Sequence, residues 1–356
     1  MAFAVRHLRS EPVRGIGAGA GIVRGVTAAG QRPHGVDHAH ALRDESAALA
    51  QRQPPGFVAA ARAGVHGELG PDRRMTVAER FAEARPRLLR LAYSELGDVG
   101  EAEDVVQEAW LRLERSDAEA ILNLDAWLTT VVARLALDRL QSARARRETY
   151  VGPWLPEPLL SDEEDPADRV TLDESVSYAL LTVLEQLSPA ERTAFVLHDV
   201  FDLPFAEIAE VVGRTPEAVR QLASRARRHV KRESPRFSAS RDEHNRAVRA
   251  FAQAITEGNL EGLVAALDPD VVWTSDGGGH ATALRKPLSG QARVARAWAA
   301  LSHRSVAEPK EIILNGQLGL VVASRDGHRA ALSFVVSDGR ITRIDAVRNP
   351  EKLRRL

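Results

Sequence analysis

Residues 187–232 constrain the fold of this chain most, because they carry the pattern of a helix-turn-helix. Apolar residues at helical spacing lead to Gly213, a residue that tolerates the left-handed conformation of a helix C-cap. Thr215 and Pro216 then supply an N-cap and a proline at the first helical position, which predicts a second helix from Pro216. Its inward stripe is Val219, Leu222 and Ala226. Its other positions are polar or basic: Arg220, Gln221, Ser224, Arg225, Arg227, Arg228, Lys231 and Arg232. The pattern predicts a helix that binds a polyanion.

Length and charge limit the classes of protein. The chain has 356 residues, 44% of them hydrophobic, which is enough for two or three domains with ordinary cores. A formal net charge of -1 excludes a uniformly basic protein, so any affinity for nucleic acid must come from local patches. The absence of cysteine excludes disulfides and thiolate metal sites, and no cofactor or metal motif is found. Without an apolar run of roughly 20 residues or a secretory signal, we expect a cytoplasmic protein with no membrane segment.

The N-terminal extension, 1–74, lacks Trp and Tyr and shows no amphipathic period. This composition predicts disorder, with scattered arginines as the weaker sign of a nucleic-acid-binding arm. Recognisable folding pattern begins directly after Met75, which makes that residue a candidate for the true translation start.

A first helical domain is expected over 76–147. Its second helix, 101–115, has one acidic face with Glu101, Asp104, Gln107, Glu108 and Trp110 exposed or half-exposed. This face is either solvated or binds a basic or helical protein partner. A third helix from about Asp125 leaves Trp127, Arg134, Asp138, Arg139, Arg144, Arg146 and Arg147 outside. Basic residues there complement the helix dipole, and an aromatic beside them also suits single-stranded nucleic acid.

A linker is expected over 148–169, because this segment is rich in proline and carries acidic residues at 162–165. Its WLPEP portion (154–158) is unusual for a spacer, since a tryptophan must dock against something. A second helical domain follows over 170–233 and includes the helix-turn-helix.

After Ser234 the pattern changes to α+β. Helices are expected near 242–257 and 291–301, and strands at 271–275, 311–314, 318–324, 330–336 and 341–347. Turns at 315–316, 326–327 and 338–339 have the Asn-Gly or Asp-Gly sequence of hairpins. We therefore expect helices followed by a curled antiparallel sheet.

Two separate motifs carry a resemblance to a known family. EAEDVVQEAWLRL followed by DAWLTTVVARLALDRL, and then LSPAERTAFVLHDVFDLPFAEIAEVVGRTPEAVRQLASRAR across the linker, resemble the two helical domains of bacterial extracytoplasmic-function sigma factors. The remainder, 242–356, is similar to a SnoaL-like domain of the nuclear-transport-factor-like cone fold. WLPEP, DGGG (276–279) and NPEKL (349–353) resemble the signatures of a subgroup with this extension, in which a lysine usually follows the glycines; here His280 does.

The resemblance implies partners and site residues. Core RNA polymerase is expected to contact Asp104, Gln107, Glu108 and Trp110. The minus-ten promoter element is expected at Trp127, Arg134, Asp138 and Arg139, and the minus-thirty-five element at Arg220, Gln221, Ser224, Arg225, Arg227 and Arg228. Arg220 and Gln221 would reach base edges, whereas Arg227, Arg228 and Lys231 would hold phosphate. Regulatory contacts are expected at Trp154, Leu155, Pro156, Asp276, Gly277, Gly278, Gly279, Asn349, Pro350 and Leu353.

Two rival functions remain open. The cone fold often houses isomerases and cyclases, and Trp273, Asp276, His280, His303 and Asp345 are the candidate catalytic residues, although no pair among them has a diagnostic spacing. Alternatively, the helix-turn-helix binds DNA without polymerase and the cone senses an unknown small ligand. The preferred hypothesis is a non-enzymatic sigma factor tuned in cis by its fused C-terminal domain.

Overall fold

The computed structural model describes residues 75–147, 150–161, 176–233, 239–302, 308–324 and 327–356, all of which belong to one compact unit. The extension 1–74, the acidic cluster at 162–165, the expected helical residues 170–175 and His303 lie outside the described residues. The side chains of Arg144, Arg146 and Arg147 do so as well.

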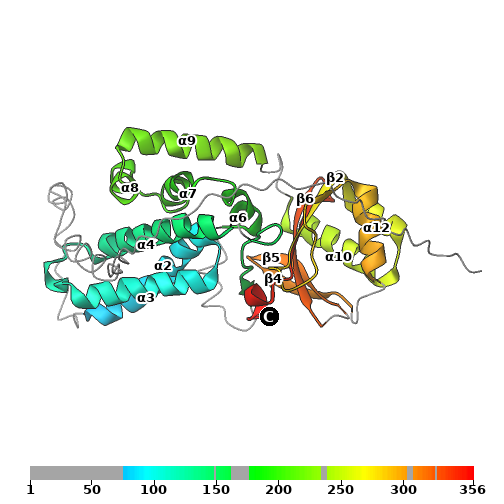
Figure 1. Cartoon of the computed structure of the whole chain (residues 1–356), viewed down its shortest axis with the longest axis horizontal. Helices are drawn as coiled ribbons and strands as arrows, with labels where there is room; N and C mark the ends of the chain where they lie inside the picture. Colours follow the sequence, from blue (N-terminus) through cyan, green and yellow to red (C-terminus); the bar gives the residue numbers. More distant parts are fainter. Residues whose placement is uncertain (1–74, 148–149, 162–175, 234–238, 303–307, 325–326) are drawn as a thin grey trace, which may run out of the picture. The chain divides into compact units, whose positions relative to one another are not determined.

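The first helical domain is formed by α2 (Val77–Leu96), α3 (Val99–Arg115) and α4 (Leu124–Arg147), with a short 3-10 turn η2 (Ala118–Ala120) before α4 (Figure 1). Local sequence sets the helix ends. Thr76 and Glu79 form a capping box at the start of α2, and Gly97 ends this helix with a positive φ of 66°. Asp98 then caps α3 by accepting the Glu101 amide, so the sharp turn between the helices is encoded in two adjacent residues.

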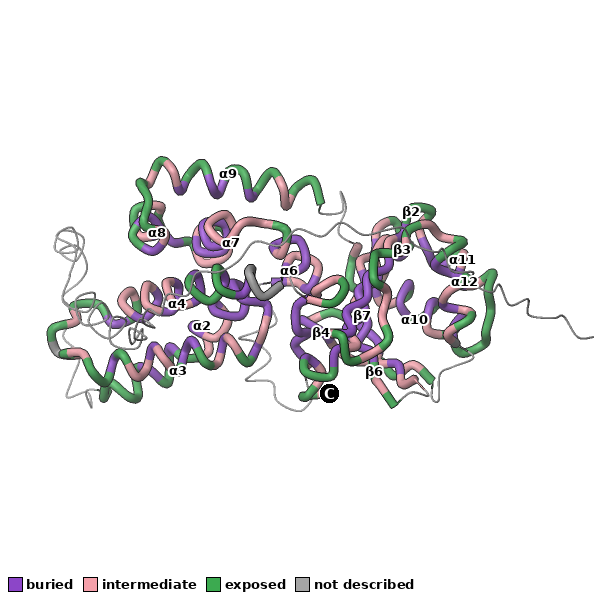
Figure 2. The backbone as a smooth tube through the Cα atoms, in the orientation of Figure 1, coloured by how far each residue is buried: buried purple, intermediate pink, exposed green. Residues whose placement is uncertain are grey.

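The second helical domain contains α6 (Tyr178–Leu184), α7 (Pro189–Phe195), the π-helical turn η3 (Val196–Val200), α8 (Phe205–Val212) and α9 (Pro216–Glu233). The helix-turn-helix is confirmed: Gly213 adopts φ 69° and the Thr215 hydroxyl accepts the Ala218 amide at 3.2 Å. The predicted inward stripe of α9 is buried, and Figure 2 shows exposed residues along the rest of this helix. The π-helical turn was not predicted.

The apolar core does not stop at the domain boundary. One cluster of buried side chains takes members from α2, α3 and α4, from Ala194 and Leu197 of the α7–η3 segment, and from α8 and α9. Hydrophobic packing therefore joins the two helical domains.

The C-terminal domain has helices on one face of a curved sheet (Figure 1). The helices are α10 (Arg241–Glu257), α11 (Leu260–Ala266) and α12 (Gln291–Ser302), and a 3-10 turn η4 (Pro350–Leu353) follows the last strand. The strands are β1 (Leu160–Ser161), β2 (Leu267–Asp276), β3 (Leu288–Ser289), β4 (Lys310–Leu314), β5 (Gln317–Ala323), β6 (Arg329–Ser337) and β7 (Arg340–Val347). They lie in the order β1-β4-β5-β6-β7-β2-β3.

Two of the three predicted hairpin turns are confirmed, and Asp326 of the third lies outside the described residues. Asn315 and Gly316 have φ values of 47° and 76°, and Asp338 and Gly339 have 51° and 70°, as a type I′ turn requires. The expected antiparallel sheet is wrong for one pair, because β2 pairs parallel with β7. No hairpin joins these strands, which are separated in the chain by α12 and four further strands, so turn chemistry does not fix their relative direction.

A strand from the linker extends the C-terminal sheet. Leu160 and Ser161 of β1 pair antiparallel with Leu314 and Ile313 of β4. The linker is thus attached to the C-terminal domain by backbone hydrogen bonding, which its proline-rich composition did not predict.

Candidate functional site

The acidic face of α3 is available to a partner. Asp104 and Gln107 are exposed, and Glu108 and Trp110 are partly exposed, as the helical period predicts. The Trp110 ring packs on Phe81 with centroids 4.8 Å apart, which fixes its orientation. The face therefore combines negative charge with one anchored aromatic.

The outer side of α4 is partly engaged within the chain. Trp127 packs against the helical core, while Asp138 and Arg139 are exposed. The Arg134 guanidinium donates to the backbone oxygen of Glu210, at 3.1 Å, in α8 of the second helical domain. Although Asp138 is exposed, desolvation by the surrounding protein raises the pKa of its carboxyl group, and the charges of Arg112 and Arg134 act in the opposite direction. Two of the residues expected at the minus-ten element are thus involved in contacts that DNA would have to replace or accommodate.

The second helix of the helix-turn-helix, α9, presents two kinds of arginine. Arg225 pairs with Glu191 at 2.9 Å, and Arg227 pairs with Asp199 at 2.6 Å. Arg220, Gln221, Ser224 and Arg228 are exposed on the same helix. Only the second group presents its side chains without a carboxylate partner among the described residues.

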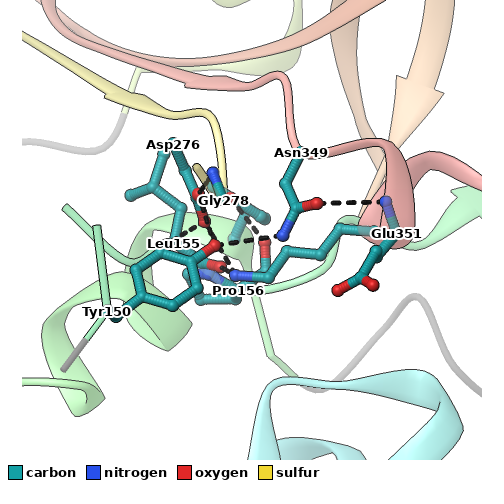
Figure 3. Close-up of polar contacts among 9 residues, drawn as sticks. Tyr150, Leu155, Pro156, Asp276, Gly278, Asn349 and Glu351 are labelled. Atoms are coloured by element: carbon teal, nitrogen blue, oxygen red, sulfur yellow. Dashed lines mark hydrogen bonds and ion pairs between the residues drawn. The ribbon is translucent and has the colours of Figure 1, made fainter. Parts of the chain in front are cut away.

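A polar cluster joins the linker to the C-terminal domain, and Figure 3 shows Tyr150, Leu155, Asp276 and Asn349 of this cluster. Together with Lys352, which pairs with Asp276, we call these residues the linker cluster. The Asp276 carboxylate is fully buried and accepts from the Tyr150 hydroxyl at 2.7 Å and from the Leu155 amide at 2.9 Å. Lys352 pairs with the same carboxylate at 2.7 Å and also donates to the Leu155 backbone oxygen. Burial, and then the hydrogen bond and charge of Asp276, raise the pKa of Tyr150 above its ordinary value.

Aromatic rings and glycines complete this cluster. The Lys352 ammonium lies 3.9 Å from the centroid of the Trp154 ring, a cation–π distance. Gly278 has φ 62°, and a Cβ there would lie 2.4 Å from Asn349 side-chain atoms. Asn349 in turn donates to the Tyr150 hydroxyl at 3.0 Å. The DGGG segment is therefore the strand-end turn that brings β2 against the end of the chain.

The WLPEP segment also contacts both helical domains. Tyr93 of α2 donates its hydroxyl proton to the Glu157 backbone oxygen at 2.7 Å, and Tyr178 of α6 donates to the Pro156 oxygen at 2.9 Å. Asn315, in the β4–β5 turn, donates to the Tyr93 hydroxyl at 3.0 Å. A few linker residues thus connect α2, α6 and the C-terminal sheet.

A second buried polar group lies between α2 and α7. Thr193 donates to Glu95 at 2.9 Å, and Arg192, paired with Glu185, donates to the Ser94 backbone oxygen at 3.3 Å. Glu95 is fully buried, and its second carboxylate oxygen has no hydrogen-bond partner in the described part of the chain. Burial raises the pKa of Glu95 to about 7, although the charge of Arg192 and the Thr193 hydroxyl act in the opposite direction.

The catalytic candidates that the structure describes do not form one cluster. Trp273 points into the helical side of the sheet, where its ring packs on Trp298 with centroids 4.9 Å apart. Asp345 is paired across strands with Thr274, the neighbour of Trp273, so both Asp345 and Asp276 face the other side of the sheet. Asp345 is buried in an ion pair with Arg343, and His280 is exposed. These residues do not line the open groove of about 640 Å³ between α10, α11 and the β6–β7 turn.

The three segments predicted to make regulatory contacts do lie in contact with one another, but the sequence did not identify several of the side chains that make these contacts. Tyr150, Lys352, Glu157, Tyr93 and Asn315 were not predicted. One signal was present: a buried aspartate at the end of an apolar strand needs a counter-charge. The sequence does not identify that cation as Lys352 rather than His280.

Within the ranges described, no helix is long and apolar enough to cross a bilayer. The same residues contain no group of three His, Asp or Glu side chains arranged to hold a metal ion.

Three family models match successive parts of the chain. Sigma-70 region 2 matches residues 81–146, Sigma-70 region 4 matches 177–230, and a SnoaL-like domain matches 248–344. The order and the positions are those of the two helical domains and the C-terminal domain.

Two relatives from Mycobacterium tuberculosis cover most of the chain. The ECF RNA polymerase sigma factor SigJ is 41% identical over 292 residues, which are 78% of this chain and 93% of SigJ. The probable ECF RNA polymerase sigma factor SigI is 36% identical over 271 residues, 76% of this chain and 92% of SigI. The crystal structure of SigJ superposes with a TM-score of 0.66 at 37% identity, covering 78% of this chain and 98% of that one. The chain therefore belongs to the extracytoplasmic-function RNA polymerase sigma factors, transcription initiation factors that bind core RNA polymerase and promoter DNA, and it carries a fused SnoaL-like domain.

Proposed function

We propose that this sigma factor is restrained in cis: its C-terminal domain holds the linker and so limits how the two helical domains engage polymerase and promoter. The observation that carries the proposal is the buried ion pair of Asp276 and Lys352, whose two side chains bind both backbone polar groups of Leu155 in the linker. The linker can therefore change its path only if the ion pair of Asp276 and Lys352 breaks, or if the ion pair moves together with the linker.

The contacts between the helical domains support the same proposal. Arg134, expected at the minus-ten element, donates to α8, and the helical core is continuous from α4 to α8. Arg355, near the end of the chain, pairs with Glu103 on α3 at 2.8 Å. Because Glu103 precedes the expected polymerase contact Asp104, the C-terminal segment lies beside that contact surface.

We also propose that the C-terminal domain acts by these contacts rather than by catalysis. Asp276, its most buried polar candidate, is used to hold the linker. A protein that works on RNA polymerase in this way acts in the cytoplasm.

The polymerase-binding face of α3 can be tested by charge reversal. We expect Asp104→Lys to weaken binding to core polymerase about tenfold or more, because it places a cation where a complementary partner surface needs an anion. The measurement is co-elution of the full chain with bacterial core RNA polymerase, followed by run-off transcription from a promoter selected out of random DNA. Glu257→Lys on α10 is the matched control, since it makes the same charge change at an exposed position of the C-terminal domain.

Absence of any complex with the wild-type chain, and also with a Lys352→Met variant that releases the linker, would overturn the proposed function. Equal losses of polymerase binding for Asp104→Lys and Glu257→Lys would leave the proposed function intact. They would, however, contradict the assignment of the polymerase-binding face to α3.

The recognition helix can be tested by comparing two arginines. Arg220→Ala should lose about 1 to 3 kcal/mol of discrimination at one position of the minus-thirty-five element, because a base-edge contact is sequence-specific. Arg228→Ala should weaken binding to all promoters similarly, because a phosphate contact does not depend on base sequence. It should also lower the slope of log affinity against log salt concentration by about 1. Both are measured as holoenzyme affinities for single-base promoter variants at several salt concentrations. Sequence-blind losses of equal size for both variants would refute the division of roles.

A further inference from the structure

Three stacked side chains connect the recognition helix to the segment before α8. The Cζ atom of Arg220 lies 5.1 Å from the centroid of the Phe205 ring. The His198 ring lies against the same phenylalanine, with centroids 4.0 Å apart and planes inclined by 32°. The imidazole and the guanidinium thus both contact the Phe205 ring, at distances at which ring–ring and cation–π attraction act.

The backbone fixes the far end of this stack. His198 Nδ1 is 2.9 Å from the Leu203 backbone oxygen, and because a carbonyl only accepts, Nδ1 carries the proton. His198 lies in the π-helical turn η3, after which Asp202 adopts φ 55°. A π-helical turn contains an additional residue, so it turns the side chains after it to directions that a continued α-helix would not give them. The orientation of His198 is thus set by this turn and by its hydrogen bond.

Arg220 differs from Arg225 and Arg227 of α9. Arg225 and Arg227 are paired with Glu191 and Asp199, whereas Arg220 has no carboxylate partner within the described ranges. Stacking uses the flat face of a guanidinium, and its N–H donors point outward in the plane. Its edge therefore stays available for hydrogen bonds. Two parallel in-plane donors match the O6 and N7 acceptors of guanine in the major groove.

We infer that Phe205 is a positioning residue that, supported by His198, holds the Arg220 guanidinium for bidentate recognition of one guanine in the promoter. The inference rests on the proposed binding of promoter DNA by α9 and adds the base that is read and the residues that set the geometry. A long arginine side chain has many rotamers in solvent, and the stack restricts them before DNA binds.

The test is Phe205→Leu in the full chain bound to core polymerase, with single-base substitutions across the minus-thirty-five element. Leucine keeps apolar volume in this half-buried position but lacks the ring that attracts the guanidinium. We expect the preference for one guanine to fall about two- to fivefold, as the loss of an exposed cation–π contact implies, with affinity for unrelated DNA unchanged within about twofold. Phe205→Tyr should keep the wild-type preference, and Arg220→Ala should remove it at the same position.

The matched control is Phe201→Leu, because Phe201 is also half-buried and its ring lies 5.7 Å from a different arginine, Arg90 of α2. It should leave base preferences unchanged. In an Arg220→Ala background, Phe205→Leu should have no further effect on the guanine preference. If Phe205→Leu fails to fold, Phe205→Met replaces it.

Three outcomes would overturn the inference. A uniform loss on all DNA with Phe205→Leu would show a structural role only, and a change of base preference that persists without Arg220 would show a different route. A loss with Arg220→Ala but none with Phe205→Leu rejects the positioning role and leaves the proposed function intact. Unchanged base preferences with Arg220→Ala itself would instead remove the proposed role of this arginine, and the inference with it.

Discussion

Lys352→Met is expected to lower the free energy of unfolding of the C-terminal domain by about 3 kcal/mol, because it leaves the Asp276 carboxylate buried without its cation. Asp276 is fully buried and its carboxylate is 2.7 Å from the Lys352 ammonium. The same change removes the lysine donor to the Leu155 backbone oxygen and the cation over the Trp154 ring. We therefore expect the linker to detach before the domain unfolds.

Amide hydrogen exchange gives the direct measurement. The Leu155 amide, which donates to Asp276 in the wild-type chain, should exchange faster in Lys352→Met, and run-off transcription per bound factor should rise because the restraint is lost. Arg354→Met is the matched control, since Arg354 is 74% exposed and two residues away. The double variant Lys352→Met with Asp276→Asn should lose less free energy of unfolding than the two single variants lose together, because the two side chains interact. Equal behaviour of Lys352→Met and Arg354→Met in both measurements would contradict the proposed restraint.

Glu95→Gln is expected to raise stability above pH 7 and to remove part of its dependence on pH. The pKa of Glu95 is raised from 4.5 to about 7, so the folded protein keeps a proton that the unfolded chain has already lost. The unfolded state then binds fewer protons between these values, and stability falls as pH rises through about 7. A shift of this size corresponds to up to about 3 kcal/mol at high pH, of which about 1 kcal/mol is lost between pH 6 and 8.

The measurement is urea unfolding at several pH values. At each pH, the free energy of unfolding of the Glu95→Gln variant is subtracted from that of the wild-type chain. This difference removes the contribution of the histidines, which titrate in the same range. Glu217→Gln, at an exposed position of α9, should keep the wild-type slope. A parallel pH dependence for wild type and Glu95→Gln would show that Glu95 does not retain its proton in the folded state.

Much of the fold followed from local sequence. The turn before α9 was predicted from Gly213, Thr215 and Pro216, and the structure has the corresponding C-cap and N-cap. The Asn-Gly and Asp-Gly turns at 315–316 and 338–339 were predicted for the same reason, since their positive φ values suit these residues. Such features depend on neighbouring residues along the chain and can therefore be predicted from the sequence.

Other features depend on residues far apart in sequence. The parallel pairing of β2 with β7, the β1 strand from the linker and the π-helical turn η3 were not predicted. Each is stabilised by packing or hydrogen bonding with distant segments. The local sequence pattern does not distinguish these features from an antiparallel pairing, an irregular linker or a regular α-helix.

The sequence by itself determined the helical domains, the α+β C-terminal domain, and which segments matter, including WLPEP, DGGG and NPEKL. Only the tertiary structure decided which side chains form the buried ion pair and hydrogen bonds. Lys352 is the cation for Asp276, Tyr150 is a second donor to Asp276, and Glu95 is a buried carboxyl group that accepts from Thr193. The reason is physical. A helix cap or a turn is a property of a few consecutive residues, whereas an ion pair or a raised pKa arises from burial and from partners that folding brings together.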